Sequence, residues 1–375
     1  MLIESFEVKN FRSLKHLKLE KLARVNLLVG KNNSGKTSVL EGLFLFTGYD
    51  VFSWIDHIDG ERRLSGNGQG FDYLFYQFSP ENSITLKSHI KPGNHSQYST
   101  PPYDIEVIIQ PLPLERTVNQ LLLPGLLETE DLYRSGGVPK QAINRLRFTA
   151  DSTENSSAPS GVFYTTQQRW TGLNERLATK RNALAQLALG HWLGTTTSFP
   201  NLYARIEYLK VKKQDARLVK IMQQIDPRIN DIVLGSEHSI YLNLGVDFTN
   251  LLPLNLMGDG VQHLLDISAA MAHTPGAVIQ IDEIDNGLHY STLRILWKGI
   301  LQAAREFDVQ VFVTTHSAEA LRNLTWVLDD EENASYRDEV AAYTLIRAKD
   351  DTVSSFRYDA SQLEFALEHD IEIRN

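Results

Sequence analysis

Three short motifs carry side chains suited to holding and cleaving a triphosphate. The segment from Gly30 to Thr37 reads Gly-Lys-Asn-Asn-Ser-Gly-Lys-Thr and fits the phosphate-loop pattern G-x-x-x-x-G-K-[ST]. An acidic pair, Asp282-Glu283, follows an apolar run, and a second apolar run ends in Thr-Thr-His-Ser with the histidine at position 316. Glycine-rich loops cradle phosphates, carboxylates hold magnesium, and histidine can hydrogen-bond a phosphate oxygen. Together the three motifs predict chemistry on ATP.

The phosphate loop has the residue types that this chemistry needs. Glycines allow backbone N–H groups to turn toward the phosphates without a Cβ clash, and the following helix N-terminus adds partial positive charge. We expect Lys36 to reach the β- and γ-phosphates and the Thr37 hydroxyl to bind Mg²⁺. The predicted nucleotide contacts from this segment are Gly30, Asn32, Asn33, Ser34, Gly35, Lys36, Thr37 and Ser38.

The acidic pair stands at the end of a predicted buried strand, residues 277–281. An aspartate at the tip of a strand beside the phosphate loop is where Mg²⁺ needs its second protein ligand, which assigns Asp282. Glu283 is then placed to act as the general base for an attacking water. A second acid of this kind favours hydrolysis over phosphoryl transfer to a metabolite. Alone, the pair would also fit a solvated turn.

His316 follows another predicted buried strand, residues 309–314. At that tip an imidazole could hydrogen-bond the γ-phosphate and position the water. A lone histidine is more often structural. Its place one helix after the acidic pair favours a catalytic role, together with Lys36 and Glu283.

Both ends of the chain show the periodicity of an α/β protein. Alternating or continuous apolar runs predict strands at 2–9, 14–22, 24–29, 84–90, 103–109, 277–281, 309–314, 341–347 and 353–358. Helical spacing predicts helices at 37–46, 172–193, 202–225, 261–272, 291–307, 318–324 and 361–369. We divide the chain into an N-terminal ATPase lobe with a β-rich part (1–115), a largely helical insertion (116–250) and a C-terminal ATPase lobe (251–375).

Composition narrows the class of protein. The absence of cysteine excludes a disulfide framework and a thiolate metal site. Apolar runs are too short to cross a bilayer and the N-terminus does not resemble a signal peptide, so we expect a cytoplasmic protein without membrane association. The net charge of −9 argues against a dedicated nucleic-acid binder, although a local basic stripe stays possible.

Several motifs together resemble the ABC-type ATPases of the SMC, RecF and OLD kind, and most closely small OLD-like ATPases without a fused TOPRIM nuclease. The resemblance rests on Asn-Phe-Arg-Ser at 10–13, the phosphate loop and its helix, Met-Gly-Asp-Gly at 257–260, Asp-Glu-Ile-Asp-Asn-Gly-Leu-His at 282–289 and Thr-Thr-His-Ser at 314–317. It covers about the first fifty and the last 125 residues. It implies an ABC-type P-loop ATPase head with mixed sheets and a helical insertion.

The resemblance also implies how such a protein works. Members act as head-to-head dimers, in which Gly258, Asp259 and Gly260 at a helix start would cap the γ-phosphate held by the other subunit. Arg12 would contact the nucleotide. Gln77 is the candidate for the Q-loop glutamine, and His289 matches a histidine typical of the subgroup, without a derived role. The implied ligands are ATP and Mg²⁺.

Three departures from the family pattern disfavour some of the functions known in the family. The signature lacks a full Ser-Gly-Gly-Gln, which disfavours a transporter subunit, and long coiled-coil arms are missing, which disfavours a true SMC protein. Only about sixty residues follow His316, too few for a fused nuclease. The first hypothesis is a nucleotide-gated ATPase acting with a separate nuclease or other effector in bacterial anti-phage defence or DNA maintenance. The alternatives are a RecF-like repair ATPase acting directly on DNA and a nucleotide-switched scaffold that hydrolyses slowly.

The middle of the chain has two features with open interpretations. A basic stretch could contact DNA phosphates or form a solvated helix face or a partner-docking surface; it comprises Lys210, Lys212, Lys213, Arg217 and Lys220. An apolar stripe predicts a core or a dimer interface; it comprises Leu202, Ile206, Leu209, Leu218 and Ile221.

Overall fold

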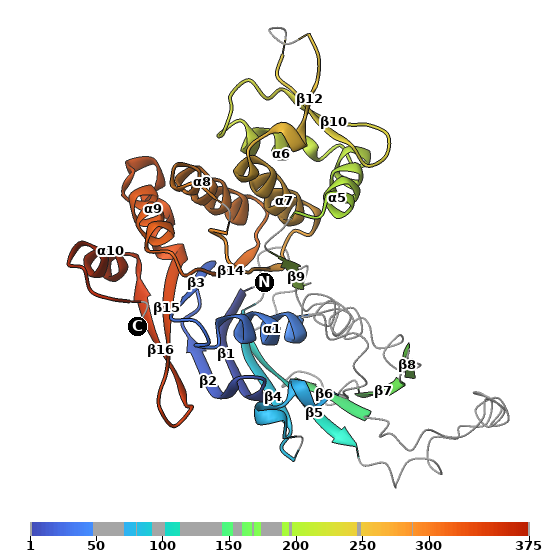
Figure 1. The fold of residues 1–375 in the computed structure, drawn as a ribbon, viewed down its shortest axis with the longest axis vertical. Helices are drawn as coiled ribbons and strands as arrows, with labels where there is room; N and C mark the ends of the chain where they lie inside the picture. The colour runs from blue at the N-terminus through green and yellow to red at the C-terminus, as the bar shows by residue number, and fades with distance from the viewer. Residues whose placement is uncertain are drawn as a thin grey trace, which may run out of the picture.

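Two large β-sheets and a layer of helices build the molecule (Figure 1). The computed structural model describes residues 2–47, 71–79, 81–91, 102–112, 145–152, 160–166, 169–173, 190–194, 197–245, 249–286 and 288–373. Within these residues, no helix is both long enough and apolar enough to cross a membrane.

The central sheet has six strands in the order β16-β15-β3-β14-β13-β9. Its strands are β3 (Val25–Val29), β9 (Gly190–Leu193), β13 (Val278–Ile281), β14 (Gln310–Thr314), β15 (Val340–Arg347) and β16 (Val353–Asp359). All neighbours pair in parallel except β16, which runs antiparallel to β15. Parallel strands end at the same edge of a sheet, so the carboxyl ends of β3, β14 and β13 lie side by side.

Both faces of this sheet are buried, which explains the continuous apolar runs in its strands. Successive side chains of a strand point to opposite faces. Leu27 and Val29 therefore join one core cluster while Leu28 joins another, and Phe312 of β14 shares the cluster of Leu28. The sheet thus divides the molecule into two cores.

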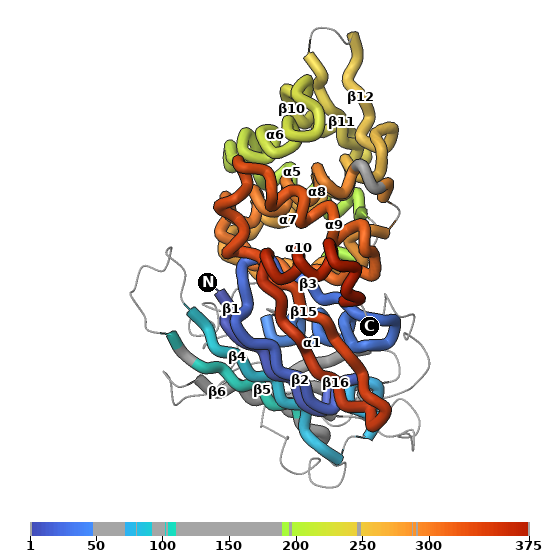
Figure 2. The backbone as a smooth tube through the Cα atoms, turned by 90° about the vertical axis from the view of Figure 1, so that its left-hand side faces the viewer, coloured from blue at the N-terminus to red at the C-terminus, as the bar shows by residue number. Residues whose placement is uncertain are grey.

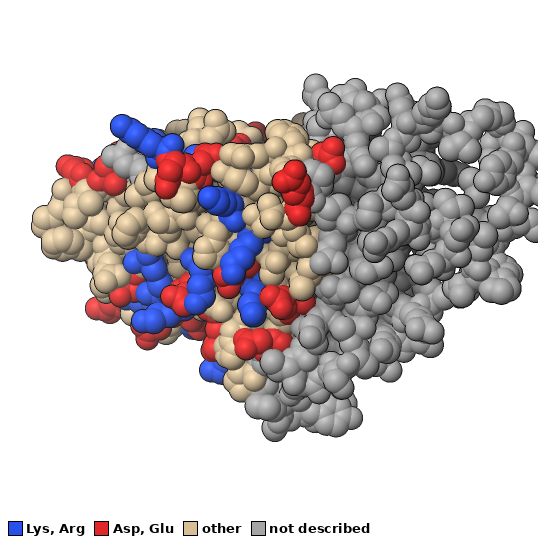
Figure 3. Space-filling model, turned by 90° about the horizontal axis from the view of Figure 1, so that it is seen from below, with Lys and Arg blue, Asp and Glu red and all other residues tan. Residues whose placement is uncertain are grey.

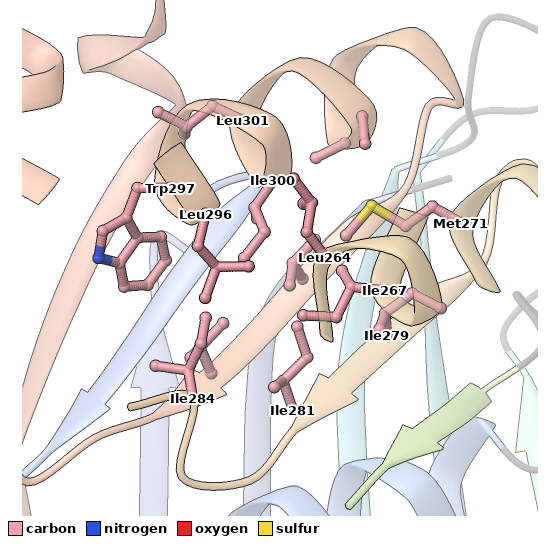
Figure 4. Close-up of a cluster of buried hydrophobic side chains, with 14 of the residues drawn as sticks. Leu264, Ile267, Met271, Ile279, Ile281, Ile284, Leu296, Trp297, Ile300 and Leu301 are labelled. Atoms are coloured by element: carbon pink, nitrogen blue, oxygen red, sulfur yellow. The ribbon is translucent and has the colours of Figure 1, made fainter. Parts of the chain in front are cut away.

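The first core lies between the central sheet and the helical layer. The helices are α5 (Phe199–Val211), α6 (Asp215–Met222), α7 (Asp259–His273), α8 (Tyr290–Glu306), α9 (Ala318–Asp329) and α10 (Ala360–Glu368). Figure 4 shows α7 and α8 side chains such as Leu264, Met271 and Ile300 packed over Ile279 and Ile281. Beyond them lies a small sheet of β10 (Asp231–Leu234), β11 (Ile240–Asn243) and β12 (Leu252–Pro253).

The second core lies between the central sheet and an antiparallel sheet of order β2-β1-β4-β5-β6-β7-β8 (Figure 2). Its strands are β1 (Leu2–Phe11), β2 (Leu14–Glu20), β4 (Ile84–Lys91), β5 (Tyr103–Leu112), β6 (Arg145–Ser152), β7 (Ser160–Thr166) and β8 (Arg169–Leu173). Helix α1 (Lys36–Thr47) fills this core with Val39, Leu40 and Leu43. The buried Gln310 amide joins the sheets, because it donates to and accepts from the backbone of Ile3 at 2.8 Å each.

The predicted α/β fold with mixed sheets is confirmed. The apolar stripe from Leu202 to Ile221 is also settled as core, because all five side chains are buried in the first core.

One prediction in the middle of the chain is wrong. Residues 190–193, predicted to end a helix, form β9, because their backbone groups pair with the otherwise open edge of β13. Within the described part of the predicted insertion, β6 to β8 continue the ladder that β5 begins, and the largely helical character of 116–250 stays a prediction. The remainder of the predicted helix 172–193, from 174 to 189, lies outside the described residues. The division into lobes at 115/116 and 250/251 stays a prediction.

The single helix predicted over 202–225 is also wrong, since the chain breaks it into α5 and α6. Lys213 adopts a left-handed conformation with φ 56° at the junction. The N–H groups of Lys213 and Gln214 bond back to the carbonyls of Lys210 and Leu209. The residue that adopts this left-handed conformation at a helix end is most often glycine. With lysine there, the sequence carried no stop signal.

Candidate nucleotide site

The phosphate loop leaves the buried end of β3 in a shape that only glycine permits at its first residue. Gly30 has φ +145°, and a Cβ there would lie 2.6 Å from the Leu345 carbonyl oxygen of the neighbouring β15. Gly35 has φ +102° and would bring a Cβ to 2.7 Å from Leu14. The loop is therefore pressed against β15 on one side and against the Asn-Phe-Arg-Ser corner on the other.

The predicted contacts of the loop fall into two groups. Asn32 and Asn33 are exposed, whereas Ser34, Gly35 and Ser38 are buried. The Ser38 hydroxyl lies 2.9 Å from that of Ser13, so the start of α1 is fixed to the corner.

Lys36 lies buried under the loop. Its Nζ donates to the carbonyls of Gly30 and Lys31 at 2.8 Å each. Burial lowers its pKa to about 8, and the nearby Asp282 and Glu283 partly oppose that shift. The charges of Asp282 and Glu283 thus act on Lys36, as the predicted site with all three residues requires.

The lowered pKa of Lys36 predicts how nucleotide affinity varies with pH. Its ordinary pKa is 10.5, so at pH values above about 8 the free protein increasingly holds a neutral amine, which attracts phosphate weakly. We expect the affinity for ATP to be flat below pH 8 and to fall by up to about tenfold per pH unit above it. Titration of a fluorescent ATP analogue from pH 6.5 to 9.5 measures this. A flat profile across that range contradicts the prediction.

The acidic end of β13 meets the phosphate loop as predicted. Asp282 Oδ1 lies 3.5 Å from Thr37 Oγ1 and accepts a hydrogen bond from Thr314 Oγ1 at 2.6 Å. Its backbone N–H donates to Leu193 of β9. A hydroxyl and a carboxylate at one point fit Mg²⁺, which takes few protein ligands and completes its shell with water and phosphate oxygens.

Glu283 and His316 face each other across the ends of β13 and β14. Their Oε1 and Nε2 atoms are 3.6 Å apart, and the side chains are 46% and 36% exposed. Glu283 has φ 49°, an uncommon conformation for a non-glycine residue. Its backbone N–H donates to Thr314 Oγ1 at 2.8 Å. The pair is open to an incoming phosphate and water.

Sequence analysis missed the role of Thr314. One hydroxyl accepts from the Glu283 backbone and donates to Asp282, so it orients both acids. The neighbouring Thr315 donates to Asp285 and accepts from the Ser317 N–H, and Ser317 caps α9. The sequence places a threonine at the tip of this strand, but only the strand order puts that strand between the loop and the acids.

The signature residues stand at the start of α7. Gly258 is the N-cap, and it and Asp259 are exposed. A Cβ at Gly258 would meet no described atom within 4 Å, whereas one at Gly260 would lie 1.9 Å from Thr292 Cγ2. The helix end is thus open to a second molecule, and its capping role stays a prediction.

Other residues implied by the resemblance are less well placed. The Arg12 side chain is buried and pairs with Glu41 on α1 at 3.0 Å, so contact with the nucleotide would require this pair to open. Gln77 is exposed and donates to the Tyr76 hydroxyl at 3.2 Å. Its described contacts do not include Thr37 or Asp282, the expected magnesium ligands. His289 is exposed, and its carbonyl accepts from Thr292 at the start of α8.

A residue that no sequence motif indicated also contacts the loop. Arg347, at the end of β15, donates from Nε to the Asn33 carbonyl at 2.9 Å and from Nη2 to the Ser13 carbonyl at 2.7 Å. Because 314 residues separate Arg347 from Asn33, only the pairing of β15 with β3 brings them together.

The sheet order, the phosphate loop and the acidic pair fit a P-loop ATPase of the ABC type. A family model described as "AAA domain, putative AbiEii toxin, Type IV TA system" matches residues 25–322, and the chain belongs to this family.

Individual proteins are also similar to this chain. A Helicobacter pylori protein named "ATP/GTP phosphatase" is 22% identical over 346 residues, which are 89% of this chain and 90% of the relative. RecF of Lactococcus lactis is 29% identical over 110 residues, 26% of this chain and 30% of RecF. Among solved structures, the SMC head domain from Thermotoga maritima aligns with a TM-score of 0.48 at 11% identity, over 96% of this chain and 100% of that one.

Proposed function

We propose that the protein binds ATP with Mg²⁺ and hydrolyses it in a nucleotide-gated homodimer. The observation that carries the proposal is the meeting of five side chains at one edge of the central sheet: Lys36, Thr37, Asp282, Glu283 and His316. They lie in the segments that follow three parallel strands, β3, β13 and β14, and together they offer a cation, two oxygen ligands, a base and a hydrogen-bond donor.

Each of these groups has a role in the proposal. Lys36 holds the β- and γ-phosphates, and Thr37 with Asp282 would hold Mg²⁺, which supplies charge neutralisation when bound. Glu283 accepts the proton of the attacking water. His316, 3.6 Å from Glu283, donates to the γ-phosphate and keeps the carboxylate in place.

The dimer completes the site in the proposal. Gly258 and Asp259 are exposed at the N-terminus of a 15-residue helix, where backbone N–H groups could bind the γ-phosphate of a nucleotide held by a second copy. Leu256 beside them is 71% exposed, an apolar side chain available to an interface.

A substitution at Gly258 tests this arrangement. Gly258 has φ −59° and an open Cβ direction, so Gly258→Leu should fold normally while obstructing an approaching phosphate. We expect ATP binding by the monomer to persist, ATP-dependent dimer mass to disappear and turnover to fall on the order of 100-fold. Light scattering with ATP and phosphate release provide the measurements. Ser198→Leu, at the exposed N-cap of α5, is the matched control. Normal dimers and turnover in Gly258→Leu would remove the signature from the proposal.

We also propose that the ATPase acts through a separate effector such as a nuclease, in anti-phage defence or DNA maintenance. The family description, which names a toxin and a "TA system", supports work alongside another component. Purification from its native host with a tagged chain, with and without ATP, would identify such a partner.

A RecF-like action directly on DNA is the second candidate, favoured by the similarity to RecF over 110 residues. The basic stretch gives it little support. Lys210 is paired with Asp215 and Asp231, and Arg217 with Glu306. Figure 3 shows the opposite end of the molecule, seen from below in Figure 1, and there too lysine and arginine are interspersed with aspartate and glutamate. Turnover stimulated by DNA would favour this candidate, and slow turnover with stable ATP-dependent oligomers would favour a scaffold.

A further inference from the structure

Arg347 connects three parts of the molecule around the phosphate loop. Its guanidinium donates to the Asn33 carbonyl inside the loop, to the Ser13 carbonyl in the Asn-Phe-Arg-Ser corner and to Asp351 at 2.8 Å. The planar fork of arginine can hold several acceptors in a fixed arrangement, which a lysine ammonium does not reproduce. A single side chain thereby fixes the loop relative to the corner.

The loop carbonyl that Arg347 holds belongs to a residue in an unusual conformation. Asn33 has φ 63°, in the left-handed region. Such a conformation costs free energy outside glycine, although asparagine tolerates it better than most residues, and it persists when surrounding contacts hold it. The neighbouring Leu345 carbonyl, also on β15, closes against Gly30. The end of β15 thus supports the loop at two points.

Arg347 is itself held in place by a second contact chain. Asp351, in the turn after β15, accepts from Arg347 and from the Tyr76 hydroxyl, the latter at 3.0 Å. Arg347 first, and then Tyr76, hold the pKa of Asp351 below its ordinary value, so it stays a carboxylate. Tyr76 belongs to the 71–79 segment, whose Leu74 carbonyl also accepts from the backbone of Arg12. This segment therefore reaches the phosphate loop through Asp351 and Arg347.

We propose that Arg347 is a positioning residue of the nucleotide site, which keeps the phosphate loop in its receptive shape, and that the Tyr76–Asp351 contact sets Arg347. The proposal rests on the proposed ATP site. Because the guanidinium contacts the loop backbone rather than the expected positions of the γ-phosphate ligands, its loss weakens nucleotide binding more than the chemical step.

The neighbouring strand offers a matched control. Arg357 of β16 also donates from Nε to a backbone carbonyl, that of Lys21 directly after β2, at 3.1 Å. It makes the same kind of contact but does not touch the loop. If both arginines had only a structural role, the substitutions Arg347→Ala and Arg357→Ala would therefore change ATP affinity alike.

The experiment measures ATP-analogue affinity, KM, kcat and the melting temperature without nucleotide for Arg347→Ala, Arg347→Lys and Arg357→Ala. For Arg347→Ala we expect Kd and KM to rise by about tenfold or more, with kcat changed by less than about threefold. Arg347→Lys should recover only part of the affinity, and added guanidinium at low millimolar concentration should restore part of it to the alanine variant. Arg357→Ala should bind ATP like the unsubstituted protein.

A double-variant comparison tests the connection to Tyr76. Tyr76→Phe removes only the hydroxyl, and we expect it to weaken ATP binding about threefold. Combined with Arg347→Ala it should add nothing further, because the contact acts through the missing guanidinium. Additive effects would overturn this connection.

The outcomes separate the two proposals. If the unsubstituted protein does not bind ATP, or binds it equally well after Lys36→Ala, the proposed nucleotide site fails. If ATP binds in a Lys36-dependent manner but Arg347→Ala matches Arg357→Ala in affinity, or loses kcat with KM unchanged, the positioning role fails alone.

Discussion

Lys36→Ala is expected to remove nucleotide binding. The buried ammonium is the one cation that the structure places beneath the phosphate loop within the part of the chain it describes, and charge-assisted bonds to phosphate in a desolvated site are among the strongest polar contacts in proteins. Losing them should lower ATP affinity by about two to three orders of magnitude. Isothermal titration with ATP and Mg²⁺ is the direct measurement.

The same loop supplies the control for this variant. Lys31 has an exposed side chain, and only its carbonyl takes part in the contacts of Lys36, so Lys31→Ala should bind ATP within a few-fold of the unsubstituted protein. The melting temperature of Lys36→Ala without nucleotide distinguishes a binding defect from unfolding. Equal affinities for the two variants at an unchanged melting temperature would refute the assignment of the loop.

Glu283→Gln is expected to retain ATP while nearly abolishing its hydrolysis. Glutamine keeps the size and the backbone contact to Thr314 but cannot take a proton from water. We expect kcat to fall on the order of 100-fold or more with little change in Kd, and the ATP-bound dimer to accumulate. Single-turnover hydrolysis and mass measurement with ATP give both quantities.

A nearby glutamate allows the same chemical change without the proposed role. Glu319 is exposed in the first turn of α9, three residues after His316, so Glu319→Gln should leave turnover within about twofold. Unchanged hydrolysis in Glu283→Gln would exclude it as the base, and the search would move to other groups beside His316.

Lys36→Ala and Glu283→Gln change the two sides of the proposed nucleotide site. β14 lies between β3 and β13, so the lysine loop and the acidic pair are two strands apart at the same sheet edge. Thr314 ends β14, the strand between them, and its hydroxyl donates to the Asp282 carboxylate and accepts from the Glu283 backbone N–H. The chemistry therefore depends on strand order as much as on residue type.

Much of this site was readable because its signals are local. The phosphate loop, the acidic pair and the Thr-Thr-His-Ser sequence each sit at the end of an apolar run, and such runs identify buried strands whose carboxyl ends carry ligand sites. Most predicted strands and helices of the two ATPase lobes appear near their expected bounds for the same reason.

The middle of the chain resisted prediction because its structure depends on distant partners. The sequence Gly-His-Trp-Leu at 190–193 becomes a strand only because β13 offers an unpaired edge. The break at Lys213 replaces the usual glycine signal with a lysine, and packing of α6 against α7 and α8 decides it. Arg12, predicted to contact the nucleotide, instead pairs with the buried carboxylate of Glu41.

The amino-acid sequence by itself determined the chemical groups of this protein: a loop for phosphate, a lysine, two acids and a histidine, each tied to a strand end by local periodicity. The tertiary structure alone decided which other groups serve them, namely the Thr314 hydroxyl between the acids and the Arg347 guanidinium on the loop. The reason is physical. Strand periodicity is encoded within a few residues, whereas the side chains that orient the site come from other strands, 31 residues away for Thr314 and 314 residues away for Arg347.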